Sequence, residues 1–482
     1  MSVNVLKSII DVIAEPLSVL INDCLDSGCF PGFLKLSRTI PVFKKGDPLS
    51  ASSYRPISII PALSKVVESV MNSQLTRYLE CNHLLSNLQH GFRRGRSTVS
   101  AVSDLVSRIL HGFERNEVTS LTLCDLSKAF DCLSHQHLIA KLRCYGVGGP
   151  VLETFKSYLD GRQQVLSING AVSSPRSVLH GVPQGSILGP VLFLVGINDL
   201  RLGGHALMFA DDTTIWTTGA TPLQALSEAD ALLKTARSWF AKNNLNLNEN
   251  KTQQLLCMLR RSEVDTPSNA VKLLGFNLDQ RLDWNDHVEM ICSKLTRVLY
   301  LLQKLSNLLT RNCLLMTYHG LFHSHLSYGL RLWGHATNSQ TVLKLQKRAV
   351  RIITSSARLD HCRPLFISLG VLTIFSQYIL DCLTYVKANE SQFATRSDVH
   401  KHDTRGRAAL DVPFCRLTKT KNCFPVIALK MFNKLPTAVR TLDLPSFTRT
   451  MKTWLKDRPY YSVEEFLGDN VTGILAKPAP VN

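Results

Sequence analysis

The 482-residue chain has no long apolar run. Its densest apolar segment, from Ile187 to Ile197, is too short to cross a bilayer. Charged side chains also interrupt the N-terminal segment, where a signal peptide needs a continuous apolar core. We therefore expect no membrane contact and an intracellular location.

An ordered cysteine pattern is also missing. The 13 cysteines are odd in number, and no two of them form a C-x-x-C pair. His361-Cys362, Cys415 and Cys423 also lack the spacing of zinc ligands. The sequence thus predicts reduced thiols, no disulfide framework and no zinc site.

Charge is distributed unevenly along the chain. The 55 basic and 37 acidic residues give a net charge of +18, of which residues 1–284 carry +4 and residues 285–482 carry +14. A nearly balanced first part and a strongly basic second part favour a catalytic body joined to a region that binds a polyanion. A solvated surface with spare lysines is the alternative.

Hydrophobic residues make up 45% of the sequence and charged residues 19%, which is typical of a globular protein. Apolar residues at helical spacing predict helices over residues 6–24, with a kink at Pro16, and over residues 63–70, 290–309 and 342–353. Alternating residues predict strands over residues 39–43, 121–124, 207–210 and 213–216.

The helix expected over residues 342–353 is amphipathic. Its predicted apolar face consists of Val342, Leu345, Ala349 and Ile352. The opposite face carries a basic stripe of Lys344, Lys347, Arg348 and Arg351. Such a stripe suits a nucleic-acid duplex, and a solvated helix face is the alternative.

Three aspartates lie where the predicted strands end. Asp125 follows the strand over residues 121–124, and Asp211 and Asp212 occupy the tip of a predicted hairpin. If these strands are neighbours in one sheet, the three carboxylates converge and repel one another unless cations bind. Hard oxygen ligands suit Mg²⁺, and two such ions support phosphoryl transfer. The alternative is that Asp211-Asp212 only satisfies turn chemistry at the surface.

Seven motifs follow one another between about residue 20 and residue 290, and their order and spacing resemble the reverse transcriptases of non-LTR (LINE-type, jockey-like) retrotransposons. They are Tyr54-Arg55-Pro56-Ile57-Ser58, Gln89-His90-Gly91-Phe92-Arg93, Gly95-Arg96-Ser97-Thr98, Asp125-Leu126-Ser127-Lys128-Ala129-Phe130-Asp131, Gly181-Val182-Pro183-Gln184-Gly185-Ser186-Ile187-Leu188-Gly189-Pro190, Phe209-Ala210-Asp211-Asp212 and Leu247-Asn248-Glu249-Asn250-Lys251-Thr252.

The resemblance implies an α+β fold with the architecture of a right-hand polymerase: fingers, a palm with an antiparallel sheet, and a thumb, followed by a helical basic region. We expect fingers and palm over residues 1–280, a helical thumb over 281–355 and the basic C-terminal region over 356–482. Met1-Ser2-Val3-Asn4 resembles the middle of a family motif. We therefore also expect an N-terminally truncated copy without the upstream endonuclease of complete elements.

The same resemblance implies that Asp125, Asp211 and Asp212 are catalytic residues and metal ligands. The backbone carbonyl of Leu126 is a further expected ligand. The implied cofactor is a pair of Mg²⁺ ions, with Mn²⁺ as a substitute. Asp131, at the start of a helix, is expected to be an N-terminal cap or a partner in a structural ion pair.

The resemblance assigns the incoming dNTP to Arg55, Phe130, Gln184, Gly185 and Lys251. Arg55 would bind the triphosphate bidentately, with Lys44 or Lys45 assisting. Phe130 would exclude a 2′-hydroxyl, with core packing as its alternative. Gln184 and Gly185 would lie beneath the nucleotide, and Lys251 would lie near its phosphates and donate a proton to pyrophosphate, with a plain surface lysine as the alternative.

Template and primer are assigned to two further segments. Arg93 and Arg96 stand among glycines and would hold the template backbone, with a solvated charged loop as the alternative. Leu274 and Gly275 resemble the hairpin that grips the primer end, where glycine permits close approach of the backbone.

Together these residues predict an RNA-directed DNA polymerase that adds dNTPs to a primer 3′-OH, with an RNA template and a DNA primer or target as partners. It would act as a ribonucleoprotein in the nucleus and cytoplasm. The alternative is a catalytically inactive retrotransposon remnant that binds nucleic acid through its basic surface. An RNA-dependent RNA polymerase is disfavoured by Phe130 and by Ala210, where those enzymes usually have glycine.

Overall fold

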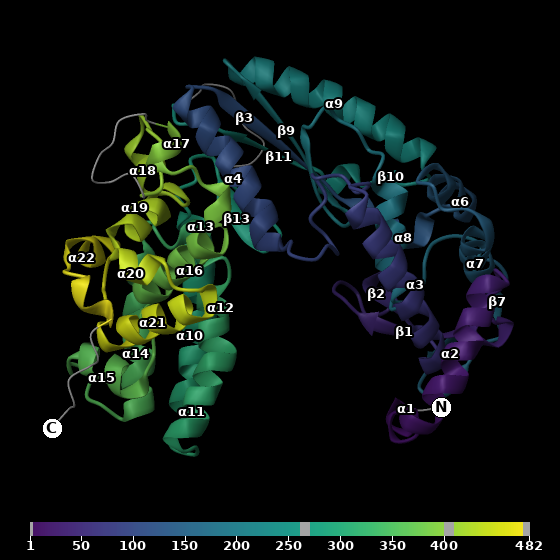
Figure 1. Cartoon of the computed structure of the whole chain (residues 1–482), viewed down its shortest axis with the longest axis horizontal. Helices are drawn as coiled ribbons and strands as arrows, with labels where there is room; N and C mark the ends of the chain where they lie inside the picture. Colours follow the sequence, from purple (N-terminus) through teal and green to yellow (C-terminus); the bar gives the residue numbers. More distant parts are fainter. Residues whose placement is uncertain (1–2, 261–269, 400–408, 476–482) are drawn as a thin grey trace. The chain divides into compact units, whose positions relative to one another are not determined.

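The computed structural model describes residues 3–260, 270–399 and 409–475, and the chain divides into two compact units (Figure 1). The first unit comprises Met1–Leu105 and Val118–Leu256, and the second comprises Val106–Glu117 and Cys257–Asn482. Residues 257–280, expected in the palm, fall in the second unit with the expected thumb and C-terminal region. The domain boundaries near 280 and 355 stay predictions.

Three of the described helices that begin in the first unit have a capping side chain. Ser97 accepts the N–H of Ser100, Ser134 accepts that of His137, and Thr221 accepts that of Gln224. The helices are α1 (Val3–Ser8), α2 (Ile10–Asp26), α3 (Ala62–Cys81), α5 (Ala129–Cys132), α6 (His135–Cys144), α7 (Gly149–Leu159), α8 (Leu188–Ile197) and α9 (Pro222–Lys242), while α4 (Thr98–Glu114) begins here and ends in the second unit.

The N-terminal helices differ from the prediction. Helix α2 continues through Pro16, and the interruption lies earlier, at Ile9. The backbone of Ile9 (φ −114°, ψ 10°) is outside the helical region, so α1 ends before the proline is reached. A proline removes one helical hydrogen bond, and the turns on either side of Pro16 remain helical in spite of this loss.

A five-stranded sheet carries the first cationic residues of the predicted site. Its order is β2-β1-β5-β6, with β7 also paired to β5. The strands are β1 (Leu36–Phe43), β2 (Tyr54–Ile59), β5 (Gln163–Ile168), β6 (Ala171–Val172) and β7 (Arg176–Ser177). Strand β1 is antiparallel to β2 and parallel to β5, and Val42 faces Arg55 across the β1–β2 pair. Arg55 and Lys44 therefore lie near the same end of this pair.

A four-stranded sheet carries the aspartates. Its order is β11-β3-β9-β8, formed by β3 (Val118–Cys124), β8 (Ala206–Phe209), β9 (Asp212–Gly219) and β11 (Gln253–Cys257). Strand β9 is antiparallel to both β3 and β8. A short antiparallel pair, β4 (Leu126–Ser127) with β10 (Asn246–Leu247), follows β3. Helices combined with antiparallel pairing confirm the predicted α+β class.

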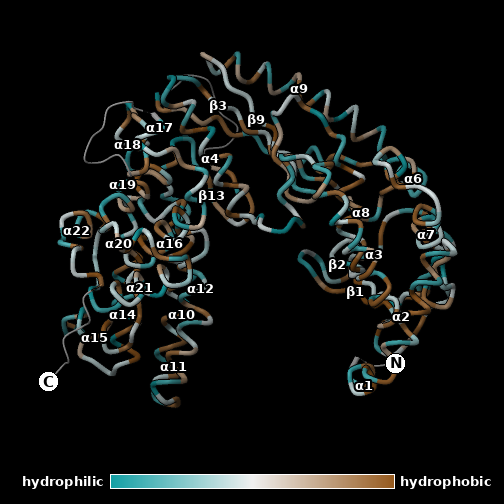
Figure 2. The backbone as a smooth tube through the Cα atoms, in the orientation of Figure 1, coloured by the Kyte–Doolittle hydropathy of each residue, from teal (hydrophilic) through white to brown (hydrophobic). Residues whose placement is uncertain are grey.

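Two helices build much of the core around this sheet. All the residues of α8 except Pro190 are buried, so the apolar run near Ile187–Ile197 is a core helix. Helix α9 packs along β3 and β9 (Figure 1). Its buried residues recur every three or four positions, and hydrophobic and hydrophilic colours alternate along it in Figure 2. The carboxylates thus stand at the end of a sheet that is well supported.

The second unit is mainly helical, with one hairpin of β12 (Ala270–Leu273) and β13 (Phe276–Asp279). Its helices are α10 (Asn285–Leu305), α11 (Arg311–Thr317), α12 (Ser324–Ser327), α13 (Leu330–Trp333), α14 (Ser339–Thr354), α15 (Cys362–Leu369), α16 (Ile374–Ala388), α17 (Arg396–Val399), α18 (Thr418–Asn422), α19 (Val426–Lys434), α20 (Thr437–Arg440), α21 (Leu444–Asp457) and α22 (Val463–Gly468). The helices expected over residues 290–309 and 342–353 correspond to α10 and α14.

Helix α14 is rotated relative to the predicted amphipathic pattern. Its buried residues are Ser339, Val342, Leu343, Gln346, Ala349, Val350 and Ile353, so Leu345 and Ile352 are only half-buried. Two members of the basic stripe make internal contacts. Lys347 lies 3.7 Å above the ring of Tyr461, and Arg351 donates to the carbonyl of Asp360. Lys344 and Arg348 are the exposed members of the stripe.

No single helix in the described part of the chain is long and apolar enough to cross a bilayer. Only α15 and α16, taken together as a pair bent by 51°, satisfy a length and composition test. Both helices contribute buried side chains to the second unit, including Phe366 and Tyr378. The expected absence of membrane contact stays a prediction.

Candidate active site

The strand register brings the three aspartates to one end of the four-stranded sheet. Cys124 of β3 pairs with Thr213 of β9, and this is the last pair between the two strands. Because the strands are antiparallel, Asp125, which follows Cys124, and Asp212, which precedes Thr213, lie at the same end of the sheet. Phe209 pairs with Asp212, so Ala210 and Asp211 form the turn between β8 and β9. The hairpin is as predicted, except that Asp212 already belongs to β9.

Electrostatic coupling among the three carboxylates follows from this placement. Part of the Asp212 side chain is exposed, but nearby protein atoms remove much of the water around its carboxylate. This desolvation raises the pKa of Asp212 to about 6, and the negative charges of Asp211 and Asp125 raise it further. Desolvation also raises the pKa of Asp211, and the charge of Asp125 raises it further. The cluster therefore holds negative charge that a bound cation would stabilise.

Lys251 makes the one direct ion pair at this cluster within the described residues. Its Nζ lies 3.0 Å from Oδ2 of Asp125. The segment that carries Lys251 is held there by its backbone, because the N–H of Asn248 donates to the carbonyl of Asp125 (2.8 Å) and β10 pairs with β4. The predicted contact of Lys251 with nucleotide phosphates is not tested, and here its ammonium neutralises a carboxylate.

Arg55 and Lys44 supply further positive charge. Both side chains are exposed, and both favour the ionised form of Asp211, which lowers its pKa against the desolvation effect. Lys44 acts on Asp212 in the same way. The sequence left Lys44 and Lys45 as equal candidates, and the structure associates Lys44 with the aspartates.

The loop Gly181–Pro190 is bound to the segment that follows Asp125. The N–H groups of Gly181 and Val182 donate to the carbonyls of Leu133 (2.7 Å) and Phe130 (2.9 Å). Gly181 has φ +78°, and a Cβ there would lie 2.7 Å from the carbonyl oxygen of Phe130. A larger residue at this position would therefore separate the two segments.

Gln184 is fixed on both its backbone and its side chain. Its carbonyl accepts the N–H of Ser58 on β2 (2.7 Å), and its Nε2 donates to Oδ1 of Asp131 (2.8 Å). Asp131 therefore orients Gln184. The prediction of an N-terminal cap is wrong, because Asp131 lies inside α5, whose N-cap residue is Lys128. The ion-pair role of Asp131 stays a prediction. Gly185 approaches β2 so closely that a Cβ would lie 2.6 Å from the carbonyl oxygen of Ser58.

Glu68 of α3 is a residue that the sequence analysis missed. Its side chain is fully buried, and Oε2 accepts the N–H groups of Ile187 (2.8 Å) and Leu188 (3.4 Å) at the start of α8. Ser64 donates to its other oxygen (3.0 Å). Glu68 thus holds the end of the Gly181–Pro190 loop from a neighbouring helix. No local signal pointed to it, because at helical spacing Glu68 lies nearly opposite Leu63, Val66 and Val70, the apolar residues that predicted this helix.

Phe130 stacks on Phe193 of α8, with ring centroids 4.3 Å apart, and the exposed Phe92 meets it edge-on at 6.2 Å. Phe130 itself is half-buried. One face of the ring is therefore used in packing. The predicted exclusion of a 2′-hydroxyl stays a prediction.

The two arginines predicted to hold the template have internal partners. Arg93 makes a bidentate ion pair with Glu80 (2.8 and 2.6 Å) and donates to the carbonyl of Ser86 (2.7 Å). Arg96 donates to the carbonyl of Asn87 (2.5 Å). These contacts give both residues a structural role in the fold, and Arg94 is the exposed arginine of this segment. Contact with a template is not tested.

Leu274 and Gly275 form the turn of the β12–β13 hairpin in the second unit, as the predicted hairpin requires. Both have positive φ (+47° and +88°), and the carbonyl of Leu274 accepts the hydroxyl of Tyr328 (2.7 Å). Leu126 lies in β4, opposite Leu247. The primer role of the hairpin and the metal role of the Leu126 carbonyl stay predictions.

The donor set of Asp125, Asp211 and Asp212 fits Mg²⁺ in chemical type, since all donors are hard oxygens. However, in residues 3–260, 270–399 and 409–475 no group of three or more His, Cys, Asp or Glu side chains is arranged to hold an ion. In this structure Oδ2 of Asp125 is instead paired with Nζ of Lys251. The side chains must rearrange before they share an ion.

Comparison with known proteins defines the class. Residues 42–278 match the family described as "Reverse transcriptase (RNA-dependent DNA polymerase)", and this range contains the aspartate site, the Gly181–Pro190 loop and Lys251. Residues 42–278 therefore belong to the reverse transcriptase family. The sheet that carries the aspartates, which the sequence analysis assigns to the palm, lies within this range.

Within this class, the predicted likeness to non-LTR elements is confirmed. The chain is 27% identical over 396 residues to the probable RNA-directed DNA polymerase from transposon X-element of Drosophila melanogaster, covering 77% of this chain and 42% of that protein. It is 30% identical over 367 residues to the corresponding protein from transposon BS of the same species (70% and 40% covered). The polymerase from mobile element jockey of that species is 27% identical over 367 residues, again with 70% and 40% covered.

The chain therefore spans about two fifths of the length of these relatives. Among solved structures, apo telomerase from Candida tropicalis aligns with a TM-score of 0.42 and 13% identity, covering 74% of this chain and 66% of that chain. This score is too low to equate the two folds.

Proposed function

We propose that the chain is an RNA-directed DNA polymerase that adds dNTPs to a primer 3′-OH and copies the RNA of a non-LTR retrotransposon. The observation that supports this most directly is the strand register that brings Asp125, Asp211 and Asp212 together inside a reverse transcriptase domain. An isolated Asp-Asp turn at a surface would not be coupled to a third carboxylate from another strand.

Asp125, Asp211 and Asp212 would hold two Mg²⁺ ions, or Mn²⁺ as a substitute, which would activate the 3′-hydroxyl and stabilise the departing pyrophosphate. The chain's own cations act beside this site. Arg55 of β2 and Lys44, which directly follows β1, would present exposed positive charge to the triphosphate. Lys251, released from Asp125, would reach the phosphates and donate a proton.

Gln184 and Gly185 would form the floor of the nucleotide site. Because Nε2 of Gln184 donates to Asp131, its Oε1 would be the atom left to accept a hydrogen bond from a substrate. Phe130, held from behind by Phe193, would exclude a 2′-hydroxyl. Arg94 would take the exposed template contact expected of its neighbours.

The native partners would be the RNA template, a DNA primer at the target site and dNTPs. The basic second unit would hold nucleic acid through exposed residues such as Lys344 and Arg348. By the same reasoning the protein would act as a ribonucleoprotein in the nucleus and cytoplasm.

Primer extension tests the proposal. Purified protein should extend a labelled DNA primer on an RNA template with dNTPs, and Asp211→Asn should abolish extension. Asp230→Asn, an exposed aspartate of α9, is the matched control and should be fully active. Salt-sensitive binding of nucleic acid without any extension would instead favour the inactive-remnant alternative. Equal extension by Asp211→Asn and the wild type would contradict the carboxylate assignment.

A further inference from the structure

The edge of the palm sheet is covered by a segment from another part of the first unit. Strand β8 is the last strand of this sheet, and Leu88–His90 lies along its free edge. The N–H of Met208 donates to the carbonyl of Leu88, and the N–H of His90 donates to the carbonyl of Met208, both at 2.8 Å. This parallel bridge ends two residues before the catalytic turn begins.

The side chain of Gln89 reaches that turn. It is only 1% exposed, and its Oε1 accepts the N–H groups of Gly91 (2.7 Å) and Ala210 (3.1 Å). Ala210 has φ +56°, a left-handed conformation that a residue with a Cβ rarely adopts. The amide that Gln89 holds therefore belongs to the strained residue immediately before Asp211.

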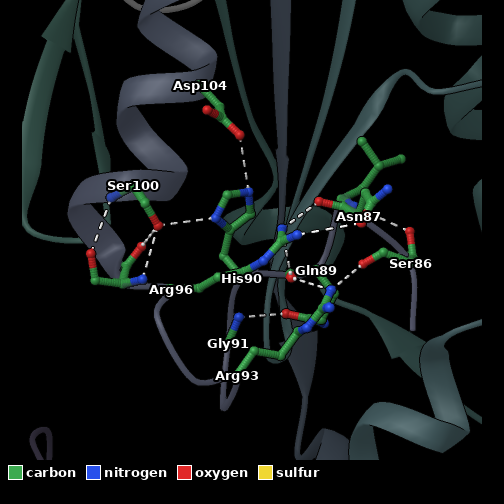
Figure 3. Close-up of polar contacts among 11 residues, drawn as sticks. Ser86, Asn87, Gln89, His90, Gly91, Arg93, Arg96, Ser100 and Asp104 are labelled. Atoms are coloured by element: carbon green, nitrogen blue, oxygen red, sulfur yellow. Dashed lines mark hydrogen bonds and ion pairs between the residues drawn. The ribbon is translucent and has the colours of Figure 1, made fainter. Parts of the chain in front are cut away.

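Gly91 adds a second contact with the same residue. A Cβ on Gly91 would lie 2.3 Å from the nitrogen of Ala210, so only glycine allows this approach. Figure 3 shows Arg93 and Arg96 directed at the backbone of Gln89, and both guanidinium groups donate to its carbonyl (3.4 and 3.3 Å). The backbone of Gln89 is thus fixed independently of its side chain.

The geometry points to Gln89 as a positioning residue for the catalytic turn. By accepting the Ala210 N–H it keeps the peptide that precedes Asp211 in its left-handed conformation, and this sets the direction of the Asp211 carboxylate. Because Gln89 is buried and its side chain accepts the Ala210 N–H, it would act through Ala210 rather than by contact with substrate or ion. The expected effect of Gln89 on kcat rests on the proposed polymerase function. Its effect on the protection of the Ala210 amide does not, and can be measured separately.

Amide hydrogen exchange tests the structural consequence. Gln89→Met keeps the length of the side chain and removes the acceptor, and Gln74→Met, on the exposed surface of α3, is the matched control. The Ala210 amide should exchange at least about tenfold faster in Gln89→Met than in the wild type and be unchanged in Gln74→Met. Equal exchange in the two variants would overturn the inference, whether or not the protein is a polymerase.

Primer extension tests the kinetic consequence. Misplacement of a catalytic group by about 1 Å costs on the order of 10²-fold in rate, so kcat of Gln89→Met should fall by about that factor. The KM for dNTP and the Kd for primer–template should change less than about twofold. A wild-type level of kcat, or an equal loss in all three quantities with a lowered melting temperature, would refute a positioning role.

A second variant decides the question if Gln89→Met does not fold. Gln89→Glu keeps the acceptor oxygen and replaces Nε2, which has no hydrogen-bond partner in the part of the chain that the structure describes. Burial at this position favours the protonated acid, which has the same shape as the amide. The Ala210 amide should then exchange at the wild-type rate, and kcat should exceed that of any folded variant without the acceptor by at least about tenfold. Unprotected Ala210 in Gln89→Glu would contradict the inference.

Discussion

Replacement of Glu68 should loosen the loop that carries Gln184, although Glu68 lies on a different helix. Its carboxylate is fully buried and supplies the acceptor for the first N–H groups of α8. Glu68→Leu keeps a side chain of similar size but leaves the N–H groups of Ile187 and Leu188 without an acceptor. Glu68→Gln keeps one acceptor oxygen and removes the charge.

The magnitude follows from those bonds. An unsatisfied buried donor costs about 1–3 kcal/mol, and the longer of the two bonds, at 3.4 Å, counts toward the low end. Burial of leucine returns about 1–2 kcal/mol. We therefore expect Glu68→Leu to destabilise the first unit by about 1–2 kcal/mol on balance, and Glu68→Gln by about 1 kcal/mol through the lost interaction with the helix N-terminus.

Thermal unfolding and amide exchange at Ile187 and Leu188 measure this effect, with Glu228→Gln on the exposed surface of α9 as the control. The variants that fold should also show a raised KM for dNTP, because the same loop carries Gln184. If Glu68→Leu melts at the wild-type temperature and both amides stay protected, the reasoning from unsatisfied donors is wrong.

Three further substitutions have defined outcomes. Gly185→Ala should raise the KM for dNTP about tenfold or more in primer extension, because its Cβ would lie 2.6 Å from the Ser58 carbonyl oxygen, whereas Gly148→Ala, whose Cβ would meet open space, should not. Arg93→Lys should lower the melting temperature by the equivalent of about 1–3 kcal/mol, since lysine cannot make the bidentate pair with Glu80; an unchanged melting curve would contradict this. Burial raises the pKa of Asp381 from 3.8 to about 6 in the folded protein, so the folded state favours the protonated acid. This stabilisation of the folded state is fully present below the pKa of Asp381 in the unfolded chain, and it is lost as the pH rises through about 6. Asp381→Asn should therefore stabilise the protein more near pH 8 than near pH 5, by about 1 kcal/mol in urea titrations, and a pH-independent difference would refute the assignment.

Strand pattern was enough to predict the centre of the site. Alternation into Asp125 and the paired strands around Asp211 specify where the chain reverses, and antiparallel pairing then leaves few registers. The short polar turn and the strands on either side of it depend on residues that are neighbours in the sequence, so they can be predicted from the sequence alone. The likeness to non-LTR elements added the residue roles that pattern alone does not supply.

Partners distant in sequence were not predictable in the same way. Arg93 was expected to face a template, but its partner Glu80 stands on a helix whose orientation no local pattern encodes. Asp131 was expected at a cap, but it meets Gln184, 53 positions away. The buried face of α14 also differs from the predicted one, because Leu343 and Gln346 are covered by neighbouring elements rather than selected by hydrophobicity alone.

Helix α3 has a consequence for how the first unit can move. One of its ends, through Glu68, holds the loop of Gln184, and the other, through Glu80, holds Arg93 in the segment that contacts the catalytic turn. A rigid helix of 20 residues transmits any tilt to both attachments at once. Displacements on the nucleotide side and on the side of Arg93 are therefore correlated, and substitutions on the solvent face of α3 can alter both without touching either.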